Sequence, residues 1–151
     1  MDHTLEEYQD YAISLRNKGY NCGQCVLMAF SKRFGMNEKY AARLSAPFGM
    51  GFSGAGEICG ALSVLAIAEG FILGGPDPQD KAKPMWATKK LYDKFKEENG
   101  GKVLCRELKT KDAAKNCPEL IKQAIRLFFE EHPDLLESHS LIDQIIKALN
   151  S

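Results

Sequence analysis

Residues 49–73, GMGFSGAGEICGALSVLAIAEGFIL, join a glycine-rich loop, one cysteine and a nearly apolar segment. Within 58–73 only Ser63 and Glu69 interrupt the apolar run. A helix that is apolar on every side is buried, either in a protein or in a membrane. This segment is shorter than the ~20 apolar residues that cross a bilayer, and it carries a glutamate. It therefore predicts a buried central helix over 58–73, with Cys59 at its start.

The composition favours a single globular domain over 1–151, since a chain of 151 residues can bury a full core. Lys plus Arg and Asp plus Glu are equal at 20 each, and neither sign forms a long block. This pattern argues against nucleic acid or an anionic membrane as a partner, and favours a small molecule or another protein. The N-terminus has no basic opening followed by an apolar stretch, so we expect no secretory signal and a cytoplasmic location.

Apolar spacing and capping residues predict a set of helices and no strands. We expect helices over 4–17, 22–34, 37–44, 58–73, 117–132 and 134–150, and an element of undecided type over 103–108. Another helix ends at about residue 98, and Pro84 either begins it or kinks it. The fold class is then an all-α bundle of about six or seven helices around the central one. In the last helix, a Ser140–Asp143 capping-box pattern accompanies an apolar stripe of Ile142, Ile145, Ile146 and Leu149.

The chain has five cysteines, and three of them, Cys22, Cys59 and Cys117, fall at predicted helix starts. The free amides and the dipole of a helix start favour a thiolate, so we expect lowered thiol pKa values there. In a reducing cytoplasm such cysteines point to redox, catalytic or metal-binding roles rather than to structural disulfides. Cys22 and Cys25 also form a C-x-x-C pair, but Cys25 alone reads better as a small buried apolar side chain. Cys105 fits function and packing equally well.

The glycine-rich loop over 49–60 has no G-K-[ST] and follows no predicted strand, so it is not a P-loop. We interpret it as bringing backbone close to the cysteines, with phosphate binding as the minor alternative. Gly56, Glu57 and Gly60 are the loop residues that would contact a cofactor. Glu57 is either a proton acceptor for a thiol or a favourable contact with the helix dipole, and the second reading is preferred.

Two other residue types were weighed as functional candidates. The three histidines, His3, His132 and His139, lie near the terminus or at helix ends and are interpreted as solvated. Trp86 is interpreted as a core or interface residue. The last helix, 134–150, has an apolar stripe with no evident internal partner and is consistent with a homodimer. A helical interaction module with incidental thiols is therefore the non-enzymatic alternative.

Four blocks in order carry a family resemblance: Asn-Cys at 21–22, GEICGALS at 56–63, CREL at 105–108 and CPEL at 117–120. Together they resemble the C_GCAxxG_C_C family of redox-active proteins, over about residues 5–130. The helix 134–150 would then be an addition to the family region. The resemblance implies that the four characteristic cysteines are Cys22, Cys59, Cys105 and Cys117, with Cys25 as an extra.

The resemblance implies a thiol-redox or metal-linked role without naming a substrate. A similar domain occurs in split-Soret-type cytochromes, which suggests electron transfer, but this chain has no C-x-x-C-H haem motif. Two chemistries remain open: dithiol–disulfide exchange with an unknown partner, or a four-thiolate site for an iron–sulfur cluster or zinc. We take Cys59 as the central thiolate and Cys22 as its nearest partner. Val64 stands where the family has a glycine.

Overall fold

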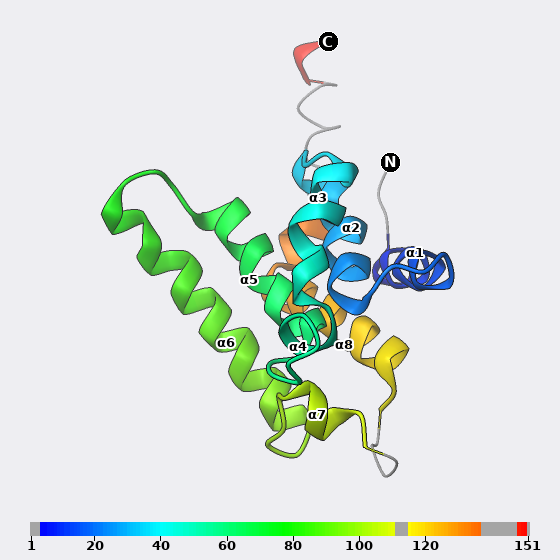
Figure 1. Ribbon diagram of the computed structural model, residues 1–151. Helices are drawn as coiled ribbons and strands as arrows, with labels where there is room; N and C mark the ends of the chain where they lie inside the picture. The colour runs from blue at the N-terminus through cyan, green and yellow to red at the C-terminus, as the bar shows by residue number, and fades with distance from the viewer. Residues whose placement is uncertain (1–3, 111–114, 137–147, 151) are drawn as a thin grey trace.

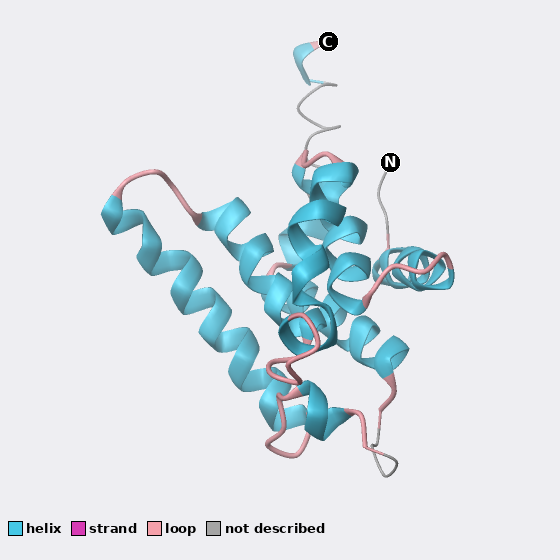
Figure 2. Ribbon diagram, in the orientation of Figure 1, coloured by secondary structure: helices cyan, strands magenta, loops and turns pink. Residues whose placement is uncertain are grey.

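The structure is a computed structural model that describes residues 4–110, 115–136 and 148–150. Its α-helices are α1 (Leu5–Asn17), α2 (Cys22–Phe34), α3 (Glu38–Ser45), α4 (Gly49–Phe52), α5 (Gly60–Leu73), α6 (Ala82–Glu98), α7 (Cys105–Leu108) and α8 (Cys117–Glu131), with 3-10 turns at Ala46–Phe48 and Pro78–Lys81. No strand is assigned in the described ranges, and one isolated antiparallel bridge joins Ile58 to Leu104. The all-α prediction is confirmed (Figure 2).

Helix α5 is the central element, as its apolar sequence predicts. It packs against α2, α6 and α8 (Figure 1), and even Glu69 on it is fully buried. The helix begins at Gly60 rather than at 58, because Ile58 is held in the bridge to Leu104 and Cys59 takes the N-cap position. The bridge therefore places the cysteine at the junction between a loop and the core.

Local capping explains where the helices that carry the site begin. The Asn21 side chain accepts a hydrogen bond from the Gln24 amide, and Gln24 returns one to the Asn21 amide, which forms a capping box at α2. Asn116 caps α8 in the same way through the Glu119 amide, and a proline follows in the first turn. These two asparagines set the positions of Cys22 and Cys117 as the first helical residues.

The structure settles one undecided element and corrects two other expectations. The undecided segment 103–108 becomes the bridge and the short helix α7. Helix α6 begins two residues before Pro84, which lies in its first turn and does not kink it, because that turn needs no amide donor there. Trp86 is 73% exposed and so is not a core residue, although an interface role stays a prediction.

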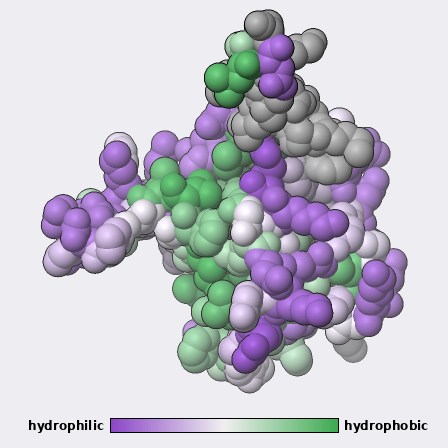
Figure 3. All heavy atoms as spheres, turned by 90° about the horizontal axis from the view of Figure 1, so that it is seen from above, coloured by the Kyte–Doolittle hydropathy of each residue, from purple (hydrophilic) through white to green (hydrophobic). Residues whose placement is uncertain are grey.

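The surface and the chain ends add three observations. Seen from above, the hairpin between α5 and α6 projects with a polar tip, and apolar side chains gather where it joins the body (Figure 3). Among the described residues, no helix combines the length and apolar character that crossing a membrane requires. Most of the predicted helix 134–150, including the Ser140–Asp143 pattern and the isoleucine stripe, lies outside the described residues.

Candidate functional site: a pocket lined by four cysteines

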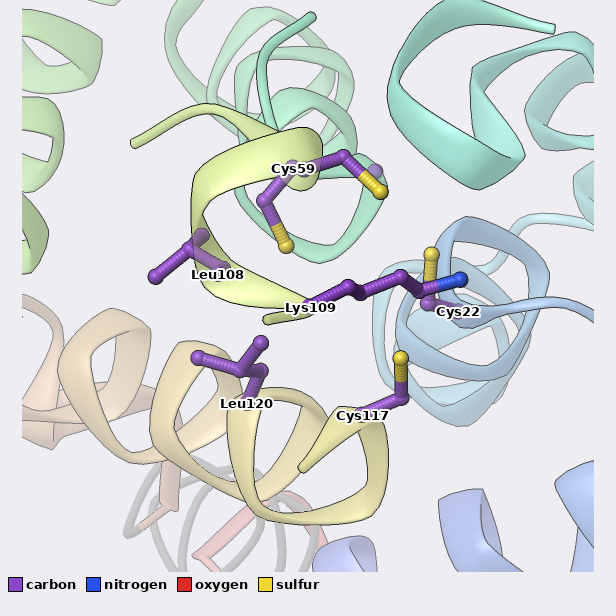
Figure 4. Close-up of a pocket in the computed structure, with 8 residues that line it drawn as sticks. Cys22, Cys59, Leu108, Lys109, Cys117 and Leu120 are labelled. Carbon is purple, nitrogen blue, oxygen red and sulfur yellow. The ribbon is translucent and has the colours of Figure 1, made fainter. Parts of the chain in front are cut away.

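Four cysteines from four separate segments line one small pocket. They come from the start of α2, the N-cap of α5, the start of α7 and the start of α8; the pocket is lined by Cys22, Cys59, Gly60, Cys105, Leu108, Lys109, Cys117 and Leu120. In Figure 4 the side chains of Cys22 and Cys117 point the same way, with Lys109 between them, and Leu108 and Leu120 lie on the other side of the pocket. All five cysteines of the chain are free thiols in this structure. The four cysteines named from the sequence are therefore brought together.

Cys22 reaches the pocket because α2 and α5 meet at glycines. A Cβ atom on Gly60 would lie 2.8 Å from Cys22 Sγ and 2.5 Å from the carbonyl oxygen of Phe48, which is closer than real contacts allow. Next to it, Val64 Cγ1 lies 3.1 Å from the position of a Cβ on Gly23. The valine that replaces the family's glycine is thus accommodated by a glycine on the facing helix.

Cys59 and Cys105 are placed by the short backbone bridge. The Cys59 amide donates to the carbonyl of Val103 at 2.8 Å, and the Cys105 amide donates to the carbonyl of Glu57 at 2.6 Å. These two bonds flank the bridged pair Ile58–Leu104 and hold the two segments together. Because Gly51 has no side chain, its backbone fits beneath Cys105, where a Cβ would lie 2.7 Å from Cys105 Cβ. The bridge therefore brings the segments that carry Cys59 and Cys105 together at the pocket.

The prediction of a lowered thiol pKa is wrong for Cys59. Burial raises its pKa to about 12, and the nearby Cys22 adds to this effect. The backbone amides of Leu62 and Ala61, at the start of α5, act in the opposite direction but do not outweigh burial. Burial also raises the pKa of Cys105, against the opposing effect of Lys109. The buried thiols are therefore held in their protonated form.

Lys109 is the lining residue that the sequence analysis missed. It is the one charged side chain among the residues that line the pocket, it is exposed, and in Figure 4 it extends across the opening between Cys22 and Cys117. The sequence feature that could have indicated it is its position four residues after Cys105, because residues four apart share a helix face. Its positive charge acts on Cys105, whose pKa it lowers against the effect of burial.

The loop residues expected to contact a cofactor have separate roles. Gly60 lines the pocket and admits Cys22. Glu57 holds Cys105 through its carbonyl, while its side chain pairs with Arg106 at 3.2 Å. The carbonyl of Gly56 accepts from the Arg106 amide at 3.2 Å, and Gly56 has a φ of 71°. Contact of these residues with a cofactor stays a prediction.

Cys25 does not line the pocket. It is fully buried on α2, its thiol donates to the carbonyl of Tyr20 at 3.6 Å, and burial raises its pKa to about 11. These features agree with its interpretation as a core residue, although Cys22 lies close enough to contribute to the same pKa shift.

His132 was interpreted as solvated, and this is wrong. Its Nε2 lies 2.6 Å from Oε1 of Glu69, the fully buried carboxylate of α5. The other oxygen of Glu69, Oε2, has no hydrogen-bond partner among the described residues. The pair fixes the end of α8 against α5 and lies outside the pocket.

The four cysteines do not form a ready metal site. Among residues 4–110, 115–136 and 148–150, no group of three or more Cys, His, Asp or Glu side chains could hold a metal ion. Tetrahedral zinc and cubane clusters require thiolates that converge on one centre. Coordination of a metal by the four cysteines stays a prediction, and no step below passes through a metal.

The fold and the pocket define an all-α protein with clustered free thiols. The family described as "Putative redox-active protein (C_GCAxxG_C_C)" matches residues 20–131, which is most of the chain, and the chain belongs to this family. The resemblance seen in the four cysteine blocks is thereby confirmed. Searches of curated proteins and of solved structures found no match to the chain.

Proposed function

We propose that this protein carries out thiol–disulfide exchange, with Cys22 as the attacking thiol and the buried pocket cysteines as its partners. One observation carries the proposal: cysteines from four segments that are distant in sequence line a single pocket. Membership of a family described as redox-active supports it. Cytoplasmic location belongs to this proposal too, because free thiols suit a reducing compartment.

Cys22 suits the attacking role because of its position. It is partly exposed, as is Cys117, whereas Cys59 and Cys105 are buried, so an external disulfide can reach Cys22. It is the first residue of α2, so the unbonded amides of the helix start lie next to it. It is also close enough to influence the pKa of both Cys59 and Cys105, while Cys117 influences only Cys105 of these two. This replaces Cys59 with Cys22 as the central thiolate.

The exchange balances as two successive displacements. The Cys22 thiolate attacks one sulfur of a substrate disulfide; the new S–S bond forms as the old one breaks, and the first thiolate leaves and takes a proton. Cys59 or Cys105 then loses its proton and attacks the Cys22 sulfur, which releases the second substrate thiol and leaves a protein disulfide. The substrate gains two electrons and the protein dithiol loses two. The positive charge of Lys109 favours the thiolate form of Cys105 when that residue gives up its proton.

A four-thiolate cluster site is the second candidate, because the same four cysteines would be its ligands. A single preparation separates the two. The protein is purified without oxygen, its metal content and visible spectrum are measured, and its free thiols are counted before and after treatment with oxidised glutathione. We expect no metal in stoichiometric amounts and a loss of thiols in pairs that reductant restores. Iron with sulfide-type absorption would replace the proposal with the cluster, and thiols unaffected by the disulfide would remove it.

A further inference from the structure

Cys25 has no role in the exchange proposed for the pocket. The thiol that lies near it is that of Cys22. It lies three residues after Cys22 on the first turns of α2 and is fully buried. No external substrate can reach a side chain with no exposed surface. Any chemistry of its thiol must therefore be exchange with another thiol of this chain.

The helix geometry permits a bond between the two. Residues three apart in an α-helix have Cα atoms about 5 Å apart, which lies within the 4.4–6.8 Å range of disulfides. The Cys25 thiol donates to the carbonyl of Tyr20, two residues before Cys22, so its sulfur lies beside the entry to α2. The two side chains also occupy one face of the helix. The start of a helix yields most readily to the small shift that bonding requires, because its first amides have no helical partner.

We propose that Cys22 and Cys25 form a dithiol–disulfide pair, and that Cys22 passes the disulfide from this pair to the thiols of the pocket. The inference rests on the proposed function and inserts one step into it: Cys25, rather than a pocket cysteine, releases the substrate from Cys22. After Cys22 has formed a mixed disulfide with a substrate, the Cys25 thiol loses its proton and attacks the Cys22 sulfur, which expels the substrate thiolate. A pocket thiol then attacks the Cys22 sulfur of the 22–25 bond, and the Cys25 thiolate leaves and regains a proton.

This transfer of the disulfide from the 22–25 pair to the pocket, called the relay below, is possible because Cys22 has thiol neighbours on two sides. On one side its sulfur packs on Gly60 at the pocket, and on the other Cys25 lies on the same helix. A rotation of the Cys22 side chain, rather than a movement of helices, exchanges one neighbour for the other. Cys25 also stays next to Cys22, because both lie on the first turns of α2, whereas the other pocket thiols come from other segments.

The experiment uses the full-length protein with oxidised glutathione added in small steps, followed by blocking of free thiols, trypsin digestion and mass spectrometry. The sequence makes the pair readable: Cys22 and Cys25 share the tryptic peptide 19–32, and each other cysteine falls on a peptide of its own. We expect this peptide to appear early in oxidation, unalkylated and lighter by two hydrogens. In Cys25→Ala we expect the glutathione adduct on Cys22 to persist at least ten-fold longer.

Val26→Ala is the matched control, because Val26 is also fully buried on α2 but carries no thiol. It loosens packing at the same place and should leave the adduct lifetime unchanged. If Cys22 is joined to Cys59, Cys105 or Cys117 from the first step while Cys25 stays reduced, this inference is overturned and the proposed function stands. If none of the five thiols forms a disulfide, both fail. Equal adduct lifetimes in Cys25→Ala and the parent protein would also overturn the relay.

Discussion

The two ends of α5 bury acidic groups in different ways. At its start, Cys59 is buried beside Cys22 and Cys105 with no cation within the buried part of the pocket, and its pKa rises to about 12. Near its other end, Glu69 is fully buried but contacts His132 at 2.6 Å. A buried acid must either keep its proton or have a partner. The thiol end keeps protons that exchange chemistry can remove, whereas the carboxylate end forms a fixed structural contact.

The largest expected effect tests the protonated state of Cys59. A pKa of about 12 in place of the ordinary 9.0 leaves about 10³-fold less thiolate at pH 8. We therefore expect iodoacetamide to label Cys59 at least about 10³-fold more slowly in the native protein than in urea. Peptide mass spectrometry over time measures the rate, with the partly exposed Cys117 as the internal reference. Similar labelling rates in the native and the denatured protein would show that Cys59 is not buried and that its pKa is not raised.

The next largest effect is on stability and tests the contact between Glu69 and His132. His132→Ala leaves the Glu69 carboxylate buried without its contact, and removing one member of a buried pair costs about 3–5 kcal/mol. Urea unfolding monitored by circular dichroism measures the loss. The double variant Glu69→Gln with His132→Ala is the control, because a neutral amide is cheaper to leave unpaired, so part of the stability should return. A loss below about 1 kcal/mol in the single variant would mean that His132 does not support the carboxylate.

Alanine substitutions at two glycines of α5 test how tightly the start of the helix is packed compared with a position near its other end. A Cβ on Gly60 would clash with Phe48 backbone and Cys22, while nothing lies within 4 Å of a Cβ on Gly70. Gly60→Ala should therefore destabilise the protein by about 1–3 kcal/mol, and Gly70→Ala should stabilise it by about 0.5–1 kcal/mol. Thermal unfolding of both variants measures the difference. If they shift in the same direction, α2 and α5 do not meet tightly at the pocket.

The buried thiols also predict a pH dependence of stability. Cys59 and Cys25 have pKa values raised from 9.0 to about 12 and about 11, so above pH 9 the unfolded chain loses their protons before the folded one does. The free energy of unfolding therefore falls as pH rises from 9, by at most about 1.4 kcal/mol per pH unit for each thiol. Urea titrations between pH 8 and 10 measure the slope.

Cys59→Ala is the control for this slope, since it removes one of the titrating groups and should make the slope shallower. Tyr11 has a pKa raised from 10.0 to about 12 by burial and by Glu38, so it contributes in the same direction only at the upper end of the range. A slope that is unchanged in Cys59→Ala would mean that this thiol titrates alike in both states.

Local sequence signals predicted the fold well. The apolar run of α5 and the asparagine caps of α2, α3 and α8 act within a few residues, so periodicity and capping rules capture them. The pKa of Cys59 was mispredicted because the helix start is a local feature, whereas the burial that outweighs it is created by packing. The start of α5 was placed two residues early because the Ile58–Leu104 bridge joins distant segments.

The site was predictable only in part. Spacing and resemblance singled out Cys22, Cys59, Cys105 and Cys117, and the structure places all of them around one pocket. Lys109 was missed because a lysine in a charged segment looks like any solvated residue until the fold places it at the opening. The Glu69–His132 contact was missed because it spans 63 residues, and no pattern in one sequence links such positions.

The smallest expected effect comes from the exposed counterpart of the buried pair. Glu57 and Arg106 form a salt bridge at 3.2 Å beside the pocket, and each side chain is 55% exposed. Water screens such a pair, so Arg106→Ala should cost less than about 1 kcal/mol. The backbone bond from Cys105 to Glu57, which does not depend on either side chain, should keep the thiol in place. Urea unfolding together with native thiol labelling tests both statements. A loss near that of His132→Ala, or faster labelling of Cys105, would show that this surface pair, and not the backbone bridge, holds the Cys105 segment.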